Sequence, residues 1–238
     1  MARFITNIDE HVAVLTMNEG ENRYNPDFLS ELMETLDEIE KETESTVLVI
    51  TSGHDKIWSN GLDLEWVMGK MAAKDDEGLK NFFLQLNQLF KRILLYPMPV
   101  IAAINGHAFA GGAITACAMD FRFMRSGRGF FCFPEVDINI PLLPGMIAII
   151  RKAVPEYKFN ELQYTGKRIT AEECVANHIM TAAAPIETLM DDVMTFAKNM
   201  NKRRAILGEM KRRANAEIVR IIDEVDPNYI GMNKFLYA

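Results

Sequence analysis

Cysteine is scarce in this chain of 238 residues, which has only Cys117, Cys132 and Cys174. An odd number of scattered cysteines without metal-type spacing argues against a disulfide framework and fits a reducing compartment. Cys117 and Cys132 lie in apolar stretches, so we expect them in the core rather than as nucleophiles.

Long apolar runs are lacking too. No stretch is long and apolar enough to span a membrane, and residues 1–8 lack the apolar segment of a signal peptide. Positive charge is also in deficit, because 26 Lys and Arg face 33 Asp and Glu, a net charge of -7. A general nucleic-acid binder needs a basic surface, so that class is not expected. The expected location is the cytoplasm.

Strand and helix patterns alternate along the first half of the chain. Residues 47–51 are apolar except for Thr51, and residues 100–104 are apolar throughout, which favours strands in a sheet that is covered on both faces. Between the strands 12–17 and 47–51, apolar residues recur at helical spacing after Asn25-Pro26, a typical helix start. This alternation predicts an α/β layered core with mostly parallel strands.

The second half of the chain contains the strand-like segments 120–124 and 130–133 and is helical from Pro141 onward, apart from a short strand near 179–183. Thr170 and Glu173 have the spacing of a capping box. Residues 70–77 are polar and are expected to form a mobile surface segment.

Two central segments, Ile104-Asn-Gly-His-Ala-Phe-Ala-Gly-Gly-Ala113 and Phe133-Pro-Glu-Val-Asp-Ile138, carry most of the functional information. In the first, a buried strand enters a Gly-rich turn that opens a helix, where backbone N–H groups without partners can bind an oxyanion. In the second, Glu135 follows in an apolar setting that raises a carboxyl pKa and suits a base near neutral pH. Such donors with one carboxylate suit proton abstraction next to a carbonyl.

Together with Trp58-Ser-Asn-Gly-Leu-Asp63, these segments resemble the crotonase superfamily, the enoyl-CoA hydratase/isomerases. The resemblance covers nearly the whole chain and depends on the order and spacing of the three blocks. It implies an α/β fold with a crotonase-like spiral of ββα units over residues 1–185 and a C-terminal helical trimerisation region over residues 186–238. An acyl-CoA thioester as substrate, and a homotrimer or a dimer of trimers, are implied in the same way.

The resemblance also implies that the backbone N–H groups of Leu62 and Gly111 hold the thioester oxygen. Both lie at Gly-rich turns that open expected helices, where the helix dipole favours negative charge. Coenzyme A enters as part of the substrate, and no metal or redox cofactor is required. By resemblance, the residues assigned to its binding near strand-end loops are Arg23, Lys56, Asn60, Gly61 and Gly106.

One departure from the family pattern decides which reaction is expected. Family hydratases use two glutamates, and here the second is Glu135 while the first position is Ile114. Hydration needs a water held between two carboxylates, which isoleucine cannot provide. The arrangement is similar to Δ3,Δ2-enoyl-CoA isomerases with a single glutamate. This similarity implies isomerisation of 3-enoyl-CoA to 2-enoyl-CoA, in fatty acid oxidation, with Glu135 as the catalytic residue.

Other interpretations stay open. Asp63, Asp137 or His107 could join Glu135 in hydration, hydrolysis or decarboxylation of a CoA thioester, or the chain could be a non-catalytic oligomer that binds acyl-CoA. More simply, Asp63 starts a helix, Asp137 caps a turn and His107 makes a structural hydrogen bond. The basic clusters 202–204 and 211–213 are expected on a solvated helix face. A helix that borders the acyl tail, or that is simply core, carries Phe82, Phe83, Leu86 and Phe90.

Overall fold

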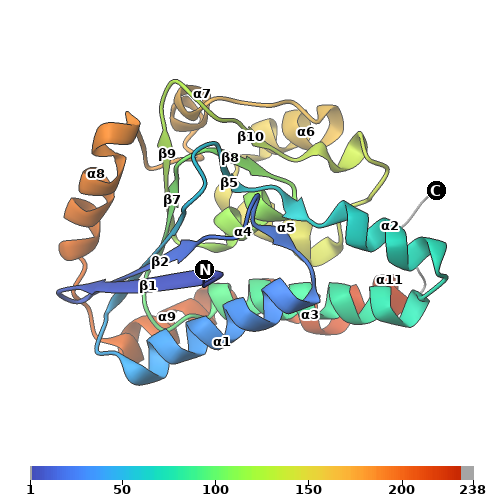
Figure 1. The fold of residues 1–238 in the computed structure, drawn as a ribbon, viewed down its shortest axis with the longest axis horizontal. Helices are drawn as coiled ribbons and strands as arrows, with labels where there is room; N and C mark the ends of the chain where they lie inside the picture. The colour runs from blue at the N-terminus through green and yellow to red at the C-terminus, as the bar shows by residue number, and fades with distance from the viewer. Residues whose placement is uncertain (1, 232–238) are drawn as a thin grey trace.

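A computed structural model of the chain describes residues 2–231, and its main sheet has six strands. Their spatial order is β1 (Phe4–Asp9), β2 (Val12–Met17), β4 (Val47–Ser52), β7 (Val100–Ile104), β9 (Phe121–Arg125) and β11 (Ala182–Ala184). β1 and β2 pair antiparallel, and every later pair is parallel (Figure 1). The mostly parallel sheet predicted from the strand–helix alternation is therefore confirmed.

Two small sheets lie beside the main one and hold the motif segments. The first is parallel, in the order β10 (Phe131–Cys132), β8 (His107–Phe109) and β5 (Ile57–Ser59). The second is the parallel pair β3 (Arg23–Tyr24) and β6 (Gly61–Leu62). The helix that follows β8 contacts β6, so the ends of β6 and β8 lie close together although the two strands belong to different sheets.

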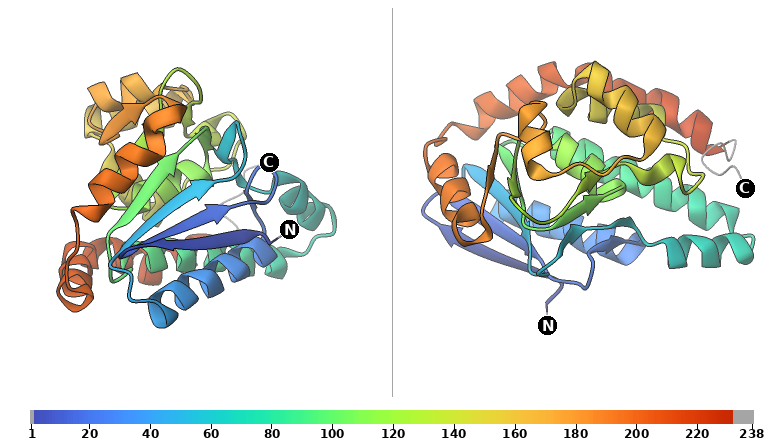
Figure 2. Two further views of the ribbon diagram at one scale, coloured as in Figure 1. Left: turned by 60° about the vertical axis from the view of Figure 1, so that its left-hand side comes forward. Right: turned by 90° about the horizontal axis from the view of Figure 1, so that it is seen from above.

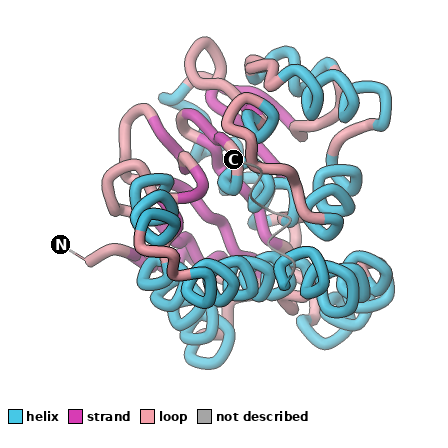
Figure 3. The backbone as a smooth tube through the Cα atoms, turned by 90° about the vertical axis from the view of Figure 1, so that its right-hand side faces the viewer, coloured by secondary structure: helices cyan, strands magenta, loops and turns pink. Residues whose placement is uncertain are grey.

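Helices surround these sheets on several sides (Figure 3). In the first two thirds they are α1 (Pro26–Glu42), α2 (Leu64–Ala72), α3 (Asp76–Leu94), α4 (Gly111–Ala118), the 3-10 turn η1 (Pro134–Val136), α5 (Pro144–Ala153), α6 (Glu156–Thr165) and α7 (Ala171–Ala176). Next come α8 (Ile186–Lys198), α9 (Arg204–Ala214), α10 (Ala216–Arg220), the π-helical turn η2 (Ile221–Val225) and α11 (Asp226–Gly231).

Both faces of the main sheet are buried, as its all-apolar strands predict. Val47, Val49 and Ile101 pack with α8 on one face, and alternate residues such as Leu48 and Ile50 belong to the larger core on the other face. This alternation follows from the two-residue period of a strand. Figure 1 shows α8 on the opposite side of the sheet from α1 and α3.

The last helices pack on the core rather than extending into solvent. η2 contacts α5, and α11 contacts α3, and Figure 2 shows the red C-terminal helices beside the yellow segment that contains α5 and α6. The division at residues 185 and 186 and the trimerisation role stay predictions, and residues 232–238 of that region lie outside the described residues.

Two expected helix starts are confirmed. The Asn25 side chain accepts a hydrogen bond from Phe28 N at 3.0 Å, and Thr170 with Glu173 forms the reciprocal capping box. The segment 70–77 lies at the surface as predicted, and most of it is helical, because α2 runs to Ala72 and α3 begins at Asp76. Asp75 caps α3 by accepting from Gly78 N at 2.9 Å, a start signal hidden among polar residues.

The prediction of a solvated face for the basic clusters holds for only part of them. Arg212 and Arg213 are exposed and pair with Glu209. Lys211 is instead buried, and its Nζ contacts Asp120 Oδ2 at 2.6 Å. Arg204 donates to three carbonyl oxygens at the C-terminal end of α1, those of Glu40, Thr43 and Ser45. Lys211 and Arg204 therefore attach α9 to the core.

Candidate active site

The backbone of Gly61 and Leu62 lies directly against the start of α4. Gly61 has a φ of +70°, and a Cβ atom placed on it would lie 2.5 Å from Gly111 N. No side chain fits in so short a gap, and the positive φ also favours glycine. The Asn60-Gly61 turn therefore brings the backbone of Gly61 against the backbone N atom of Gly111.

The two predicted donors, the amides of Leu62 and Gly111, lie on the two sides of this junction. On β6, Gly61 N donates to Ser59 Oγ at 3.1 Å, and Asp63 N donates to Tyr24 O at 2.9 Å. Successive strand amides point to opposite sides, so the N–H of Leu62 points away from β3. Gly111 is the first residue of α4, where N–H groups lack an intrahelical acceptor. Their role as donors to an oxyanion stays a prediction.

A buried tyrosine fastens this junction from behind. Tyr24 OH donates to Thr115 Oγ1 at 3.0 Å, and Thr115 Oγ1 donates to Gly111 O at 2.8 Å. Tyr24 is fully buried, and a buried phenol usually needs such a partner. Since its backbone also accepts from Asp63 N, Tyr24 holds both β6 and the first turn of α4. The sequence patterns missed this residue.

Glu135 lies in η1 and is buried, with 9% of its surface exposed. Burial raises the pKa of its carboxyl to about 7, because removal from water disfavours the charged form. Its Oε2 atom has no hydrogen-bond partner within residues 2–231. A carboxyl with this pKa can accept and return a proton near neutral pH.

Glu135 borders three cavities; Leu62 borders two of them as well, and Gly111 borders one. A cavity of about 210 Å³ lies between Glu135 and Leu62, and its wall includes Phe109 and Ala110. A smaller one of about 20 Å³ is bordered by Glu135, Leu62 and Gly111. Glu135 and the two predicted donor residues therefore border one shared cavity.

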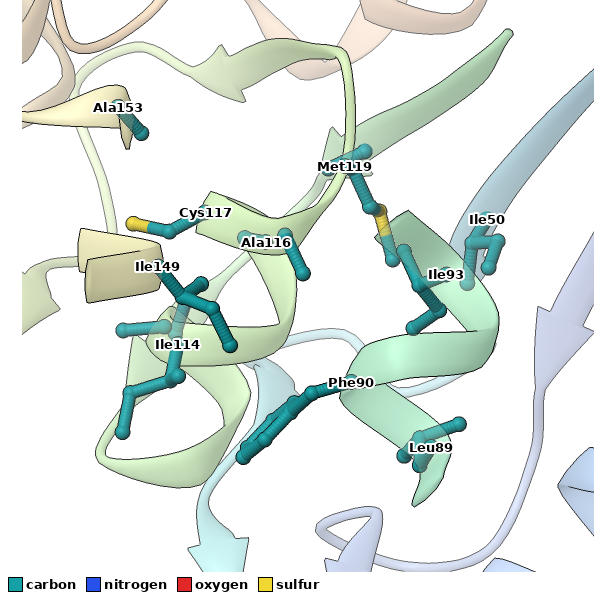
Figure 4. Close-up of a cluster of buried hydrophobic side chains, with 14 of the residues drawn as sticks. Ile50, Leu89, Phe90, Ile93, Ile114, Ala116, Cys117, Met119, Ile149 and Ala153 are labelled. Carbon is teal, nitrogen blue, oxygen red and sulfur yellow. The ribbon is translucent and has the colours of Figure 1, made fainter. Parts of the chain in front are cut away.

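Ile114 also borders the smaller cavity, and its side chain is buried, with 1% of its surface exposed. Figure 4 shows it in an apolar cluster with Phe90, Ile149 and Ala116. A space of about 20 Å³ can hold one water, which needs two to four polar partners. Among residues 2–231, Glu135 is the one acidic side chain that borders any of the three cavities.

The sequence that forms this site belongs to a longer match with a known protein family, which covers most of the chain. Residues 7–225 match the model of the enoyl-CoA hydratase/isomerase family. The chain belongs to this family. It is 30% identical over 215 residues to enoyl-CoA delta isomerase 3 of Arabidopsis thaliana, covering 86% of this chain and 88% of the relative. It is 34% identical over 171 residues to peroxisomal enoyl-CoA delta isomerase 2 of the same plant, covering 70% of each chain.

A solved structure of an enoyl-CoA hydratase/isomerase family protein from Pseudomonas syringae superposes with a TM-score of 0.87. The two chains are 24% identical, with 96% of this chain and 97% of the other covered, so this likeness speaks for the fold alone. Family membership and the crotonase-like α/β fold, both predicted from the three sequence blocks, are confirmed.

Three further polar residues were considered for the site. They are Asp63, Asp137 and His107, and each makes a local hydrogen bond through its side chain or its backbone. Asp63 caps α2 by accepting from Trp66 N at 3.2 Å, and Asp137 N donates to Pro134 O at 2.9 Å in the η1 turn. His107 Nδ1 accepts from Phe130 N at 3.2 Å, and burial lowers its pKa. His54 Nδ1 accepts from the backbone N–H groups of Lys56 and Ile57.

The structure separates the residues that were assigned to coenzyme A into two groups. Arg23 and Asn60 border the cavity of about 210 Å³, and both side chains donate to Glu21. Gly61 lies beside them at the amide junction. Lys56 and Gly106 meet elsewhere, where a Cβ on Gly106 would lie 2.2 Å from Lys56 O. Their contacts with coenzyme A stay predictions.

The four helix residues considered for the acyl tail also divide. Phe82 and Phe90 are core side chains, 1% and 0% exposed. Phe83 and Leu86 are equally buried but border the small cavity beside Glu135. Within residues 2–231, no group of three or more His, Cys, Asp or Glu side chains could hold a metal ion, and no helix in that range has the length and apolarity to cross a membrane.

Proposed function

We propose that this protein isomerises 3-enoyl-CoA to 2-enoyl-CoA by moving one proton from C2 to C4. The observation that supports this most strongly is the buried carboxyl of Glu135, which borders one cavity together with Leu62 and Gly111. Ile114 occupies the place where a second carboxylate would be needed to hold a water.

In the proposed reaction the carboxylate of Glu135 takes the proton from C2. The electrons of that C–H bond form a dienolate, whose oxygen accepts hydrogen bonds from Leu62 N and Gly111 N. Each such donor contributes about 3 kcal/mol to the stability of a developing oxyanion. The protonated Glu135 then returns the proton to C4, which leaves the double bond between C2 and C3. A carboxyl pKa of about 7 suits both halves of this exchange.

The names of related proteins support an isomerase but include other reactions. The relatives described above are enoyl-CoA delta isomerases, whereas others at similar identity are named putative enoyl-CoA hydratase and carnitinyl-CoA dehydratase. Both of those reactions move a water. With Ile114 in an apolar cluster, we favour the reaction that moves only a proton.

We propose further that Arg23, Lys56, Asn60, Gly61 and Gly106 contact the coenzyme A part of the substrate. A homotrimer or a dimer of trimers, and a cytoplasmic location, remain predictions. Sedimentation of the purified protein tests the first of these, since a monomer would contradict it.

The test of the reaction is a pair of spectrophotometric assays, one with a 3-enoyl-CoA and one with a 2-enoyl-CoA. We expect the first substrate to gain conjugated absorbance and the second to resist hydration. Hydration of the second at a comparable rate would show that another residue positions water. Binding of both thioesters without turnover of either would favour a non-catalytic role.

A further inference from the structure

The smallest of the three cavities beside Glu135, at about 20 Å³, is bordered by two helices of the core. Its wall includes Phe83 and Leu86 of α3. It also includes Leu142, which lies just before α5, and Met146 in the first turn of α5. The placement of α3 relative to α5 therefore shapes the space in which a substrate carbon would lie beside the carboxyl.

A residue far away in the sequence caps α5. Leu143 occupies the N-cap position, and its apolar side chain makes no cap hydrogen bond. Asp226, the first residue of α11, takes over this role from 81 positions away, because its Oδ1 accepts from Gly145 N at 2.8 Å. A carboxylate is favoured there by the N–H groups that lack an intrahelical acceptor and by the helix dipole.

The same carboxyl also binds α3. Asp226 Oδ2 accepts from Asn87 Nδ2 at 3.0 Å, and Asn87 directly follows Leu86 in the sequence. Asp226 and Asn87 are buried, at 0% and 1% exposed. Burial raises the pKa of Asp226 to about 6, the mark of a carboxyl that has lost its water and depends on these two hydrogen bonds. One side chain thus joins, with one oxygen each, the two helices that border the small cavity.

The packing around Gly145 is close enough to fix this arrangement. A Cβ atom on Gly145 would lie 2.4 Å from Asp226 Oδ2 and 2.8 Å from Ile222 Cγ1, so a larger residue would push η2 and α11 away from α5. The π-helical turn η2 ends directly before Asp226, and such turns between α-helical segments are frequent at functional sites. The C-terminal helices therefore contact the wall of the small cavity through a defined junction.

We propose that Asp226 is a positioning residue for the reaction. Through Asn87 and Gly145 it holds in place the two helices that shape the cavity beside Glu135. The inference rests on the proposed function and adds to it a residue that does not touch substrate. Loss of the carboxyl lets α3 and α5 shift, and a displacement of about 1 Å at the reacting atoms can lower a rate by about a hundredfold. Binding changes less, because none of the residues proposed to contact coenzyme A lies on α3 or α5.

The experiment measures kcat and KM for a 3-enoyl-CoA. Asp226→Ala removes both acceptors, so it should lower kcat by about ten- to a hundredfold with little change in KM. Asp226→Asn should retain most of kcat, because its oxygen still accepts from Gly145 N. Its amide can donate to Asn87 Oδ1, which has no partner within residues 2–231, once the Asn87 amide turns over. The matched control is Asp223→Asn, which removes a surface ion pair with Lys91 between η2 and α3 and should keep kcat.

Two more variants separate positioning from stability. Asn87→Leu leaves Asp226 bound to α5 but removes its hydrogen bond to α3, so it should lower kcat and decides the question if Asp226→Ala does not fold. Arg204→Ala removes hydrogen bonds between α9 and the C-terminal end of α1, so it should lower stability and keep kcat. The inference is overturned if Asp226→Ala folds and keeps kcat, if Asp226→Asn loses as much as Asp226→Ala, or if Asn87→Leu keeps kcat.

Binding of acetoacetyl-CoA distinguishes a failure of this inference from a failure of the proposed function. C2 of this thioester lies between two carbonyl groups, so a base that takes its proton leaves an enolate, which absorbs in the near ultraviolet. The absorbance on binding reports how Glu135 is aligned with C2, without turnover. If wild type forms the enolate but turns over no 3-enoyl-CoA, the isomerase proposal fails. An enolate signal that falls in Asp226→Ala and persists in Asp226→Asn would still support the role of Asp226, and an equal signal in both would overturn it.

Discussion

Replacing Glu135 by Gln should make the protein more stable while it removes activity. In the folded protein, burial raises the pKa of this carboxyl from 4.5 to about 7, and no cation repays the cost of ionising it. Below pH 4.5 both the folded and the unfolded chain hold the proton, so the group has no effect on stability. Between pH 4.5 and 7 the unfolded chain releases the proton first, so the free energy of unfolding falls as pH rises.

The size of this effect follows from the shift in pKa. A difference of about 2.5, from 4.5 to 7, at 1.36 kcal/mol for each pKa unit gives about 3 kcal/mol of lost stability above pH 7. The residue is only 9% exposed, so solvent screening reduces the figure little. Glutamine resembles the protonated carboxyl and cannot ionise, so Glu135→Gln should recover most of that energy at pH 8 and almost none at pH 4.5.

Urea unfolding at pH 4.5 and pH 8 measures the difference directly. Glu38→Gln, at an exposed position of α1, is the matched control and should change stability little at either pH. If Glu135→Gln is no more stable than wild type at pH 8, the carboxyl ionises without penalty in the folded protein, and the account of it as a desolvated base is wrong.

Three further predictions concern the site. For wild type, kcat/KM should rise with pH and level off above an inflection near 7, because the free enzyme needs Glu135 ionised; a profile flat from pH 5 to 9 would contradict this. Gly61→Ala should lower kcat/KM by about a hundredfold or more, since its Cβ would lie 2.5 Å from Gly111 N and displace an oxyanion donor. The control Gly69→Ala, within α2 and with open space at its Cβ, should retain activity and gain about 0.5–1 kcal/mol of stability. Tyr24→Phe removes the hydrogen bond to Thr115, so it should cost about 1 kcal/mol of stability and lower kcat more than it changes KM; an unchanged kcat would refute the positioning role.

Local features of the fold were predictable from the sequence. The helix starts at Asn25 and Thr170 depend on hydrogen bonds between residues three positions apart. Mostly apolar runs such as 47–51 indicate a sheet that is covered on both faces. Glu135 is buried, as predicted, and its neighbours Phe131 and Phe133 are buried with it, whereas Val136 is exposed.

Contacts between distant segments could not be predicted. The hydrogen bond between Tyr24 and Thr115 joins residues 91 positions apart, and Lys211 reaches Asp120 across the same number. Polar segments such as 70–77 mislead for a related reason, because Asp75 caps a helix whose apolar face begins only at Leu79.

Glu135→Gln is also the most direct test of the central claim that one buried carboxyl carries the proton. The measurement is conversion of a 3-enoyl-CoA by this variant and by wild type, with thioester binding measured alongside. The account predicts a loss of roughly two to four powers of ten in kcat with binding retained. Full activity of Glu135→Gln would contradict it.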